Sequence, residues 1–273
     1  MASAKQSLKV IACEIAQREI CWLAAQTPHL LDLEFLPVGH HDDPKNGHQD
    51  LQNRIDRIAP GQYDAILIGY GICNQMVNGL TTPHTPLIIP RAHDCITFFL
   101  GNKERYQEVF GSHPGTFFFT AGWLEFAQRK ALHQSGAGAM REAADHLGDQ
   151  TPAFGLDKTF TELVAKYGED NARYLMEISG RWSQNYGCGA LIGFDFDAAL
   201  ALPEKVQRLC TQRQWRYEEL RGNLDLLRRW LAGDWSETDF LVVPPGYQVQ
   251  PVYDERILEA APIATIKKSD FSA

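Results

Sequence analysis

The sequence predicts an α/β protein with mostly parallel sheets flanked by helices, arranged as two Rossmann-like lobes with a cleft between them. Short runs rich in Ile and Leu, bounded by Gly or Pro, indicate strands buried on both faces, and two of them occupy residues 65–68 and 87–89. Segments with helical spacing alternate with these runs, which is the βαβ pattern of a doubly wound sheet. The same order of strands and helices returns in the second half of the chain.

The first half contains most of the predicted strands. The helices stop before Thr27-Pro28 and at Ala59-Pro60-Gly61, because proline and glycine interrupt helical structure. In chain order we expect a strand at 8–12, a helix at 14–26, a strand at 33–36, a helix at 49–58, and strands at 65–68, 87–89 and 116–120.

The second half repeats the pattern without residue identity to the first. We expect a helix at 157–178, a strand at 190–194, a helix at 203–212, a strand at 215–220, a helix at 223–231 and a strand at 240–243. We assign residues 1–122 to an N-terminal lobe that carries the cysteine site, 123–180 to a helical linking region, and 181–273 to a second, smaller α/β lobe.

Composition narrows the class of protein. The chain has 273 residues, 44% hydrophobic and 22% charged, which is ordinary for a globular protein. Its formal net charge of -8 argues against nucleic acid as the main partner, since phosphate binding needs a basic face. No apolar run approaches the roughly 20 residues of a membrane-spanning helix, and the N-terminus lacks the apolar core of a signal peptide. We therefore expect a cytoplasmic protein with no membrane partner.

Three cysteines each follow a predicted strand: Cys13, Cys73 and Cys95. In a cytoplasmic protein, cysteines are more plausible as thiols or metal ligands than as a disulfide framework. Ligands of open α/β sheets bind at the carboxyl ends of the strands, so these cysteines are expected to converge in one crevice. Three thiolates with an open fourth position suit a catalytic zinc or a [4Fe-4S] cluster. The sequence contains no CxxC pair that would support a metal site. The alternative to a shared metal site is that the three cysteines are unrelated buried thiols.

The other three cysteines are expected outside this crevice. Cys188 precedes its predicted strand, which places it at the opposite edge of the sheet, and Cys210 lies in a predicted helix as a core residue. Cys21 also lies in a predicted helix, where we expect a small buried side chain.

Candidate catalytic residues surround the strand-end cysteines. His93 or His40 is predicted to donate or accept a proton, and His41 and His48 from the same region are further candidates, against the alternative of a solvated polar loop. Arg91 would lower the pKa of neighbouring thiols or hold an anionic substrate; its alternative is a surface salt bridge.

The order of residues in His93-Asp94-Cys95 predicts separate roles for the first two. Neighbouring residues of an extended segment point to opposite sides, so His93 should face the cleft with Cys95. Asp94 should then turn back into the protein and cap a helix that begins near Ile96.

A glycine-containing loop offers a cofactor-binding alternative. Gly69 and Gly71, followed by Asn74, half-match the dinucleotide fingerprint, and Gly71 and Asn74 are the candidate contacts. The third glycine is missing, and no acidic residue stands about 20 residues further on to bind a ribose. Glycines required for a tight turn are the favoured interpretation.

The segments Tyr70-Gly71-Ile72-Cys73 and Pro90-Arg91-Ala92-His93-Asp94-Cys95 resemble the uncharacterised family called domain of unknown function 1638. The segments at 117–123 and 239–246 are similar to it too, so the resemblance covers most of the chain. It implies a setting near corrinoid-dependent methyl-transfer systems, with corrinoid methyl-transfer proteins as partners.

Together these observations predict a metalloprotein enzyme, a lyase or a methyl-group transferase, that binds a small-molecule substrate at the open metal position. Two alternatives belong to other classes. One is a metal- or cofactor-handling accessory protein without catalysis. The other is a metal-free enzyme that uses Cys95 as its nucleophile.

Overall fold

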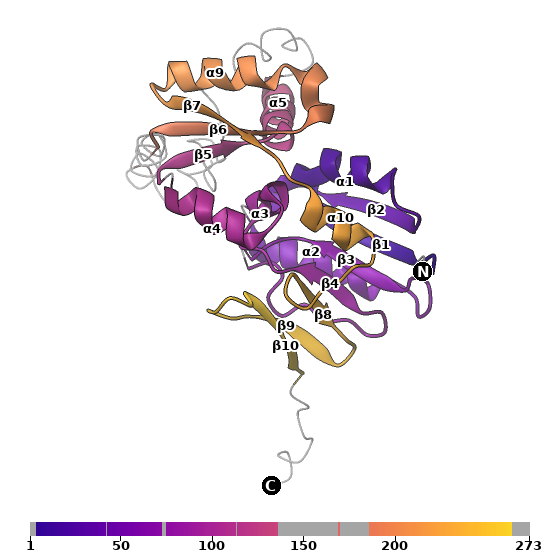
Figure 1. Ribbon diagram of the computed structural model, residues 1–273. Coiled ribbons are helices and arrows are strands. Elements are labelled where there is room, and N and C mark those ends of the chain that lie inside the picture. Colours follow the sequence, from indigo (N-terminus) through magenta and orange to yellow (C-terminus); the bar gives the residue numbers. More distant parts are fainter. Residues whose placement is uncertain are drawn as a thin grey trace.

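The computed structural model describes residues 4–41, 43–72, 75–112, 114–135, 169 and 186–263. Within these residues the chain has an α/β fold, with two sheets of mostly parallel strands flanked by helices (Figure 1), which confirms the predicted fold class. The predicted helix at 157–178 lies outside the described residues except for Glu169. The predicted cleft between lobes stays a prediction.

The larger sheet has five strands in the order β2-β1-β3-β4-β8. The first four strands are parallel to one another, and β8 pairs antiparallel with β4. Every residue of β3 and β4 is buried, as expected for a parallel sheet covered on both faces. The strands are β1 (Ser7–Cys13), β2 (Leu30–Leu36), β3 (Ala65–Gly69), β4 (Leu87–Pro90) and β8 (Phe240–Val243).

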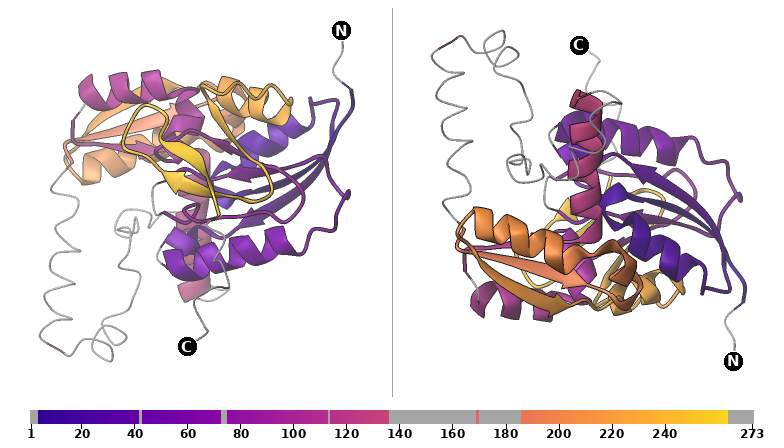
Figure 2. Two further views of the ribbon diagram at one scale, coloured as in Figure 1. Left: turned by 90° about the horizontal axis from the view of Figure 1, so that it is seen from below. Right: turned by 90° about the horizontal axis from the view of Figure 1, so that it is seen from above.

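Helices cover both faces of this sheet. Figure 2 shows α2 (Pro44–Asp56) on the face opposite to α1 (Gln17–Ala24) and α10 (Asp225–Leu231). The indole of Trp230 in α10 is fully buried and donates a hydrogen bond to the carbonyl of Ile88 in β4 at 3.2 Å.

The sheet tolerates no side chain at Gly69. A Cβ there would lie 2.5 Å from the Ala12 Cβ and 3.0 Å from the Trp230 ring. Ala12 and Gly69 therefore face α10, and the alternation of side chains along a strand turns the next residues, Cys13 and Tyr70, toward the α2 face.

The second sheet consists of β5 (Thr116–Phe119), β6 (Cys188–Gly193) and β7 (Arg216–Arg221), all parallel. The helix α9 (Leu202–Gln212) packs against β6 and β7, and α5 (Ala121–Ser135) follows β5 directly. A separate hydrophobic core beneath these elements includes Phe119, Leu191 and Val206.

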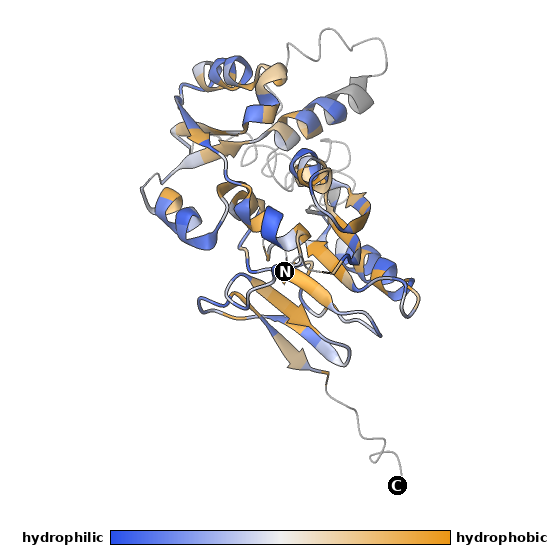
Figure 3. Ribbon diagram, turned by 45° about the vertical axis from the view of Figure 1, so that its right-hand side comes forward, coloured by the Kyte–Doolittle hydropathy of each residue, from blue (hydrophilic) through white to orange (hydrophobic). Residues whose placement is uncertain are grey.

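The remaining elements connect and cover the sheets. In Figure 3 the hydrophobic residues concentrate in the strands, whereas hydrophilic residues recur along the covering helices. No helix among the described residues is long and apolar enough to cross a membrane. These elements are the helices α3 (Cys95–Leu100) and α4 (Lys103–Ser112), the antiparallel hairpin β9 (Tyr247–Pro251) and β10 (Leu258–Pro262), and the short 3₁₀ helices η1 (Glu14–Ala16), η2 (Val38–His41) and η5 (Asp195–Leu200).

Two strands pair with partners outside the lobe to which the sequence analysis assigns them. The strand β5 was assigned to the N-terminal lobe but pairs with β6, and β8 was assigned to the second lobe but pairs with β4. The chain thus returns to the first sheet through α10, whose Trp230 anchors it there. Short apolar runs predict that a strand is buried, but they carry no information about its partner. The prediction for Cys21 is also wrong, because its side chain is exposed on α1 and not buried in the core.

Two buried carboxyl groups meet where α1 approaches η5. Glu19 is fully buried, Asp197 is 4% exposed, and none of their four side-chain oxygens has a hydrogen-bond partner among the described residues. The pKa of Glu19 is raised to about 8, mainly by burial and to a smaller extent by the negative charge of Asp197. Glu19 is therefore protonated at neutral pH.

Replacing Glu19 by Gln should make stability less dependent on pH. The folded pKa of Glu19 lies above that of the unfolded chain, so its stabilising contribution is present below about pH 4.5 and is lost as pH rises to about 8. The unfolding free energy of Glu19→Gln relative to wild type should increase from pH 5 to pH 8 by on the order of 1 kcal/mol per pH unit. Urea unfolding at each pH measures this difference. Glu104→Gln, at an exposed position of α4, is the control, and parallel profiles for Glu19→Gln and wild type would contradict the assignment.

Candidate functional site

The carboxyl edge of the larger sheet brings two segments of the predicted site together. Ala12 of β1 pairs with Gly69 of β3, so the residues that follow, Cys13 and Tyr70, lie side by side at this edge. Cys13 is the last residue of β1 and is 4% exposed. This is the position at which ligands of open α/β sheets bind.

The loops that follow β3 and β4 pack tightly against each other. The Ile72 amide donates a hydrogen bond to the Ala92 carbonyl at 3.1 Å. A Cβ on Gly71 would lie 2.8 Å from the Cα and the amide nitrogen of Asp94, a distance that real Cβ atoms essentially never show. Gly71 is thus required for this contact, which supports the interpretation of the glycines as structural. The contact holds the loop after β3 against the segment that leads into Cys95.

Cys73 and Asn74, which follow Ile72, lie outside the described residues. The convergence of the three cysteine sulfurs and the role of Asn74 therefore stay predictions. Among the described residues, no group of three His, Cys, Asp or Glu side chains has the geometry to hold a metal ion. The predicted ligand set includes Cys73, which is not one of the described residues.

Asp94 caps the helix that carries Cys95. The helix α3 begins at Cys95, and Asp94 Oδ1 accepts a hydrogen bond from the Ile96 amide at 2.9 Å. Its other oxygen, Oδ2, accepts a hydrogen bond from the Tyr106 hydroxyl at 2.8 Å. Burial raises the pKa of Asp94, and these hydrogen bonds oppose the rise. The predicted capping role is confirmed, and both oxygens serve the local structure.

His93 is held in place by aromatic stacking. Its ring lies on the ring of Tyr106, with centroids 5.7 Å apart and an interplanar angle of 26°. Tyr106 stacks in turn on Phe110 at 4.3 Å. The His93 side chain is half-buried, so its imidazole is fixed in orientation while solvent still reaches it.

Tyr70 is a residue whose role the sequence did not reveal. Its side chain is 2% exposed, and its hydroxyl has no hydrogen-bond partner in the described part of the chain. Burial raises the pKa of Tyr70, and the negative potential of Cys13 and Asp50 raises it further, so the phenol stays protonated. A buried hydroxyl that donates to nothing is costly, which marks it as a group available to a bound molecule. Its only signal in the sequence was its position directly after a predicted strand.

The helix α5 closes another side of this edge. A Cβ on Gly122 would lie 1.9 Å from the Ile15 carbonyl oxygen, so the start of α5 touches the turn that follows Cys13. Glu14 in this turn accepts a hydrogen bond from the Val38 amide at 2.8 Å and pairs with Arg129 of α5 at 2.9 Å. The turn that follows Cys13 is thus held by contacts to η2 and to α5.

His40 lies beside α2 and faces an acidic partner. Its Nε2 hydrogen bonds to Asp50 Oδ2 at 3.2 Å. The negative charge of Asp50 contributes to the raised pKa of Tyr70, so the His40–Asp50 pair lies within electrostatic reach of that hydroxyl. His48 has a structural contact instead, since its Nδ1 hydrogen bonds to the Met76 carbonyl at 2.8 Å. The side chain of His41 lies outside the described set.

The Arg91 side chain makes backbone contacts that the sequence does not predict. Its Nε donates to the Glu237 carbonyl at 2.8 Å, and Nη1 donates to the carbonyls of Arg256, at 2.7 Å, and Leu258. The guanidinium therefore ties the end of β4 to the segment before β8 and to the start of β10, because carbonyls of both segments accept hydrogen bonds from it. A role of Arg91 toward a thiol or an anionic substrate stays a prediction.

Cys188 lies in β6 of the second sheet and Cys210 in α9, which packs against that sheet, so both lie apart from Cys13 in the larger sheet, as predicted. Cys188 is the first residue of β6, at the amino end of that strand, and the Cys210 thiol donates to the Gly189 carbonyl at 3.8 Å. Burial raises the pKa of Cys210, and nearby Cys188 adds to the effect. Both are packing residues.

Replacing Asp94 tests whether its carboxylate stabilises the fold as the cap of α3. Asp94→Ala should lower the free energy of unfolding by about 1 to 2 kcal/mol, because the α3 cap and the Tyr106 acceptor are lost. Asp94→Asn should retain most of the stability, since Asn caps helices as well as Asp. Chemical denaturation measures both. Unchanged stability in Asp94→Ala would contradict the capping role.

Comparison with known proteins places the chain in a family. The family described as "Protein of unknown function (DUF1638)" matches residues 35–231, which include Tyr70, Gly71, Asp94 and Cys95. No curated protein and no solved structure matches the chain. Because the match extends over most of its length, this chain belongs to the DUF1638 family.

Proposed function

We propose that this protein is a metalloenzyme that binds zinc or an iron–sulfur cluster through Cys13, Cys73 and Cys95, with an open coordination position for a small substrate. The observation that supports it most is the contact at Gly71, which holds the loop leading to Cys73 against the loop leading to Cys95. Cys13 lies at the same edge, next to Tyr70. Thiolate ligands favour zinc or iron–sulfur clusters over magnesium or calcium.

The side chains around this edge suit proton transfer to a metal-bound substrate. His93, stacked on Tyr106, is the proposed proton donor or acceptor, and the His40–Asp50 pair is the second candidate. The Tyr70 phenol would donate a hydrogen bond to the bound molecule, because its hydroxyl has no other acceptor among the described residues. A lyase or a methyl-group transferase is the reaction class we propose, with corrinoid methyl-transfer proteins as partners.

Two other functions use the same residues. A metal- or cofactor-handling protein without catalysis would bind and release its metal readily, and the partial exposure of Cys95 is compatible with it. A metal-free cysteine enzyme would use Cys95 as nucleophile with His93 as base. The metal content of the purified protein distinguishes the last of these from the other two.

Anaerobically purified protein should contain zinc in a one-to-one ratio or show the brown colour of an iron–sulfur cluster. Alanine at Cys13, Cys73 or Cys95 should each remove most of this metal, because the loss of one of three thiolates opens the site. Elemental analysis and an absorption spectrum measure it. Cys21→Ala is the matched control, since Cys21 is exposed on α1. A metal-free wild-type protein, or retention of metal in all three variants, would refute the metal site.

Replacing Tyr70 by Phe tests whether its hydroxyl is reserved for a ligand. Removal of a buried, unpartnered hydroxyl should raise the free energy of unfolding by on the order of 1 kcal/mol. Tyr106→Phe is the matched control, because it removes the hydrogen bond to Asp94 and should be destabilising by about 1 kcal/mol. Urea denaturation compares the two. Equal destabilisation in both variants would show that the Tyr70 hydroxyl has a structural role.

A further inference from the structure

A pocket lies at the carboxyl ends of β6 and β7, where the chain leaves the second sheet and continues to α10 (Figure 1). Its volume of about 470 Å³ is in the range of small-molecule binding sites. Trp22 of α1 and Arg105 of α4 line it together with the residues that follow the two strands. The carboxyl ends of parallel strands are the usual ligand-binding edge of an open sheet.

Three stacked aromatic rings form one wall of the pocket. The rings of Phe194 and Phe196 are almost parallel, with centroids 5.3 Å apart and an interplanar angle of 4°. Trp22 extends the stack from α1, with its ring centroid 5.1 Å from that of Phe196 and an interplanar angle of 23°. Trp22 is nevertheless 51% exposed, although tryptophan side chains are highly buried on average. A large aromatic surface is thus open to a ligand.

The backbone after β7 holds this stack in place. A Cβ on Gly222 would lie 2.1 Å from the Phe194 ring, so a side chain at this position would displace the ring. The Gly222 amide donates a hydrogen bond to the Gly193 carbonyl at 2.9 Å, which joins the ends of the two strands. The aromatic wall is therefore positioned before a ligand arrives, which lowers the entropic cost of binding.

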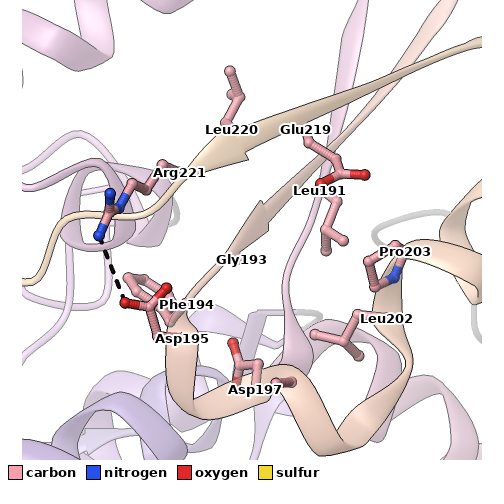
Figure 4. Close-up of a pocket in the computed structure, with 11 residues that line it drawn as sticks. Leu191, Gly193, Phe194, Asp195, Asp197, Leu202, Pro203, Glu219, Leu220 and Arg221 are labelled. Atoms are coloured by element: carbon pink, nitrogen blue, oxygen red, sulfur yellow. Dashed lines mark ion pairs between the residues drawn. The ribbon is translucent and has the colours of Figure 1, made fainter.

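The charged lining of the pocket is mainly cationic, in a chain whose formal net charge is -8. Three arginines, Arg105, Arg221 and Arg228, line it against one carboxylate, that of Asp195. Figure 4 shows Arg221 at the end of β7 with its guanidinium directed toward Asp195. These two side chains are 3.5 Å apart and are 85% and 95% exposed, so solvent screens the pair and an anionic ligand can compete for Arg221.

The other two guanidinium groups are held beside this pair. Arg105 donates hydrogen bonds to the Leu100 carbonyl at 3.3 Å and to the Arg221 carbonyl at 2.6 Å, which fixes its charge at the end of β7. Arg228 contacts Asp225 through Nη1 at 3.5 Å, and both side chains are more than half exposed. Such a contact leaves donors of Arg228 for an anion, and a guanidinium binds two oxygens of a phosphate or carboxylate at once.

We propose that this pocket binds a small molecule that joins a planar aromatic ring to an anionic group, such as a nucleoside monophosphate. The ring stacks on Trp22, and the anion accepts hydrogen bonds from Arg221 and Arg228. Stacking alone would not select a charged ligand, and arginines alone would not select a ring, so the presence of both in one pocket favours a ligand that has both. Nucleotides and aromatic carboxylic acids share this chemistry. The site does not depend on the proposed metal centre.

Isothermal titration with AMP, indole-3-acetate, adenosine and inorganic phosphate tests this site. Wild-type protein should bind AMP or indole-3-acetate more tightly than adenosine, which lacks the charge, and more tightly than phosphate, which lacks the ring. The tighter of the two aromatic anions identifies the ligand as a nucleotide or an aromatic acid. Trp22→Ala should weaken its binding about tenfold through lost stacking, and Trp22→Phe should restore most of the affinity. Arg228→Gln should weaken it by a similar factor through the lost charge-assisted hydrogen bonds.

A variant with a gain in affinity keeps the test independent of effects on folding. Asp195→Asn should tighten binding of the aromatic anion, because it removes the carboxylate that competes for Arg221. Arg216→Gln, at the amino end of β7, and Tyr253→Ala, at an exposed aromatic position outside the lining, are the controls and should change nothing.

Three results would each overturn the proposal: no binding of either aromatic anion to wild-type protein, equal affinity for inorganic phosphate, or undiminished binding to both Trp22→Ala and Arg228→Gln. Metal content at the cysteine site should be the same in all these variants, so the two proposals fail separately.

Discussion

The architecture of the candidate site depends on the close approach of two backbones at Gly71. The amide of Ile72 and the carbonyl of Ala92 are hydrogen-bonded there, and a side chain at position 71 would overlap the backbone of Asp94. Asp94 in turn caps α3 and binds Tyr106, on which His93 stacks. One contact between loops thus positions the segment of Cys95, the orientation of His93 and the loop after β3. A similar approach at Gly69 brings β3 against β1.

Several buried polar atoms have no hydrogen-bond partner in the described part of the chain, among them those of Tyr70 at the edge of the larger sheet and of Glu19 and Asp197 where α1 approaches η5. Each such group lowers stability unless a proton or a ligand compensates for it. Protonation compensates for Glu19. For Tyr70, which lies at the carboxyl edge of the larger sheet, a bound molecule is the compensation that we propose.

The sequence predicted the features that depend on local patterns. Apolar runs located β3 and β4, and the residue order around Asp94 identified it as the cap of α3. It did not predict features set by distant contacts. The pairing of β8 with β4, the exposure of Cys21 and the carbonyl partners of Arg91 all depend on segments far along the chain. The unpartnered hydroxyl of Tyr70 is visible only when all its neighbours are known.

The proposed metal site consists of three strand-end thiolates that bind one metal centre. X-ray absorption spectroscopy of anaerobically purified protein measures the ligand atoms directly. We expect three sulfur neighbours at about 2.3 Å from a zinc ion, with a lighter atom in the remaining position, or the sulfur and iron distances of a cluster. A metal surrounded by nitrogen and oxygen alone, or the absence of any bound metal, would contradict it.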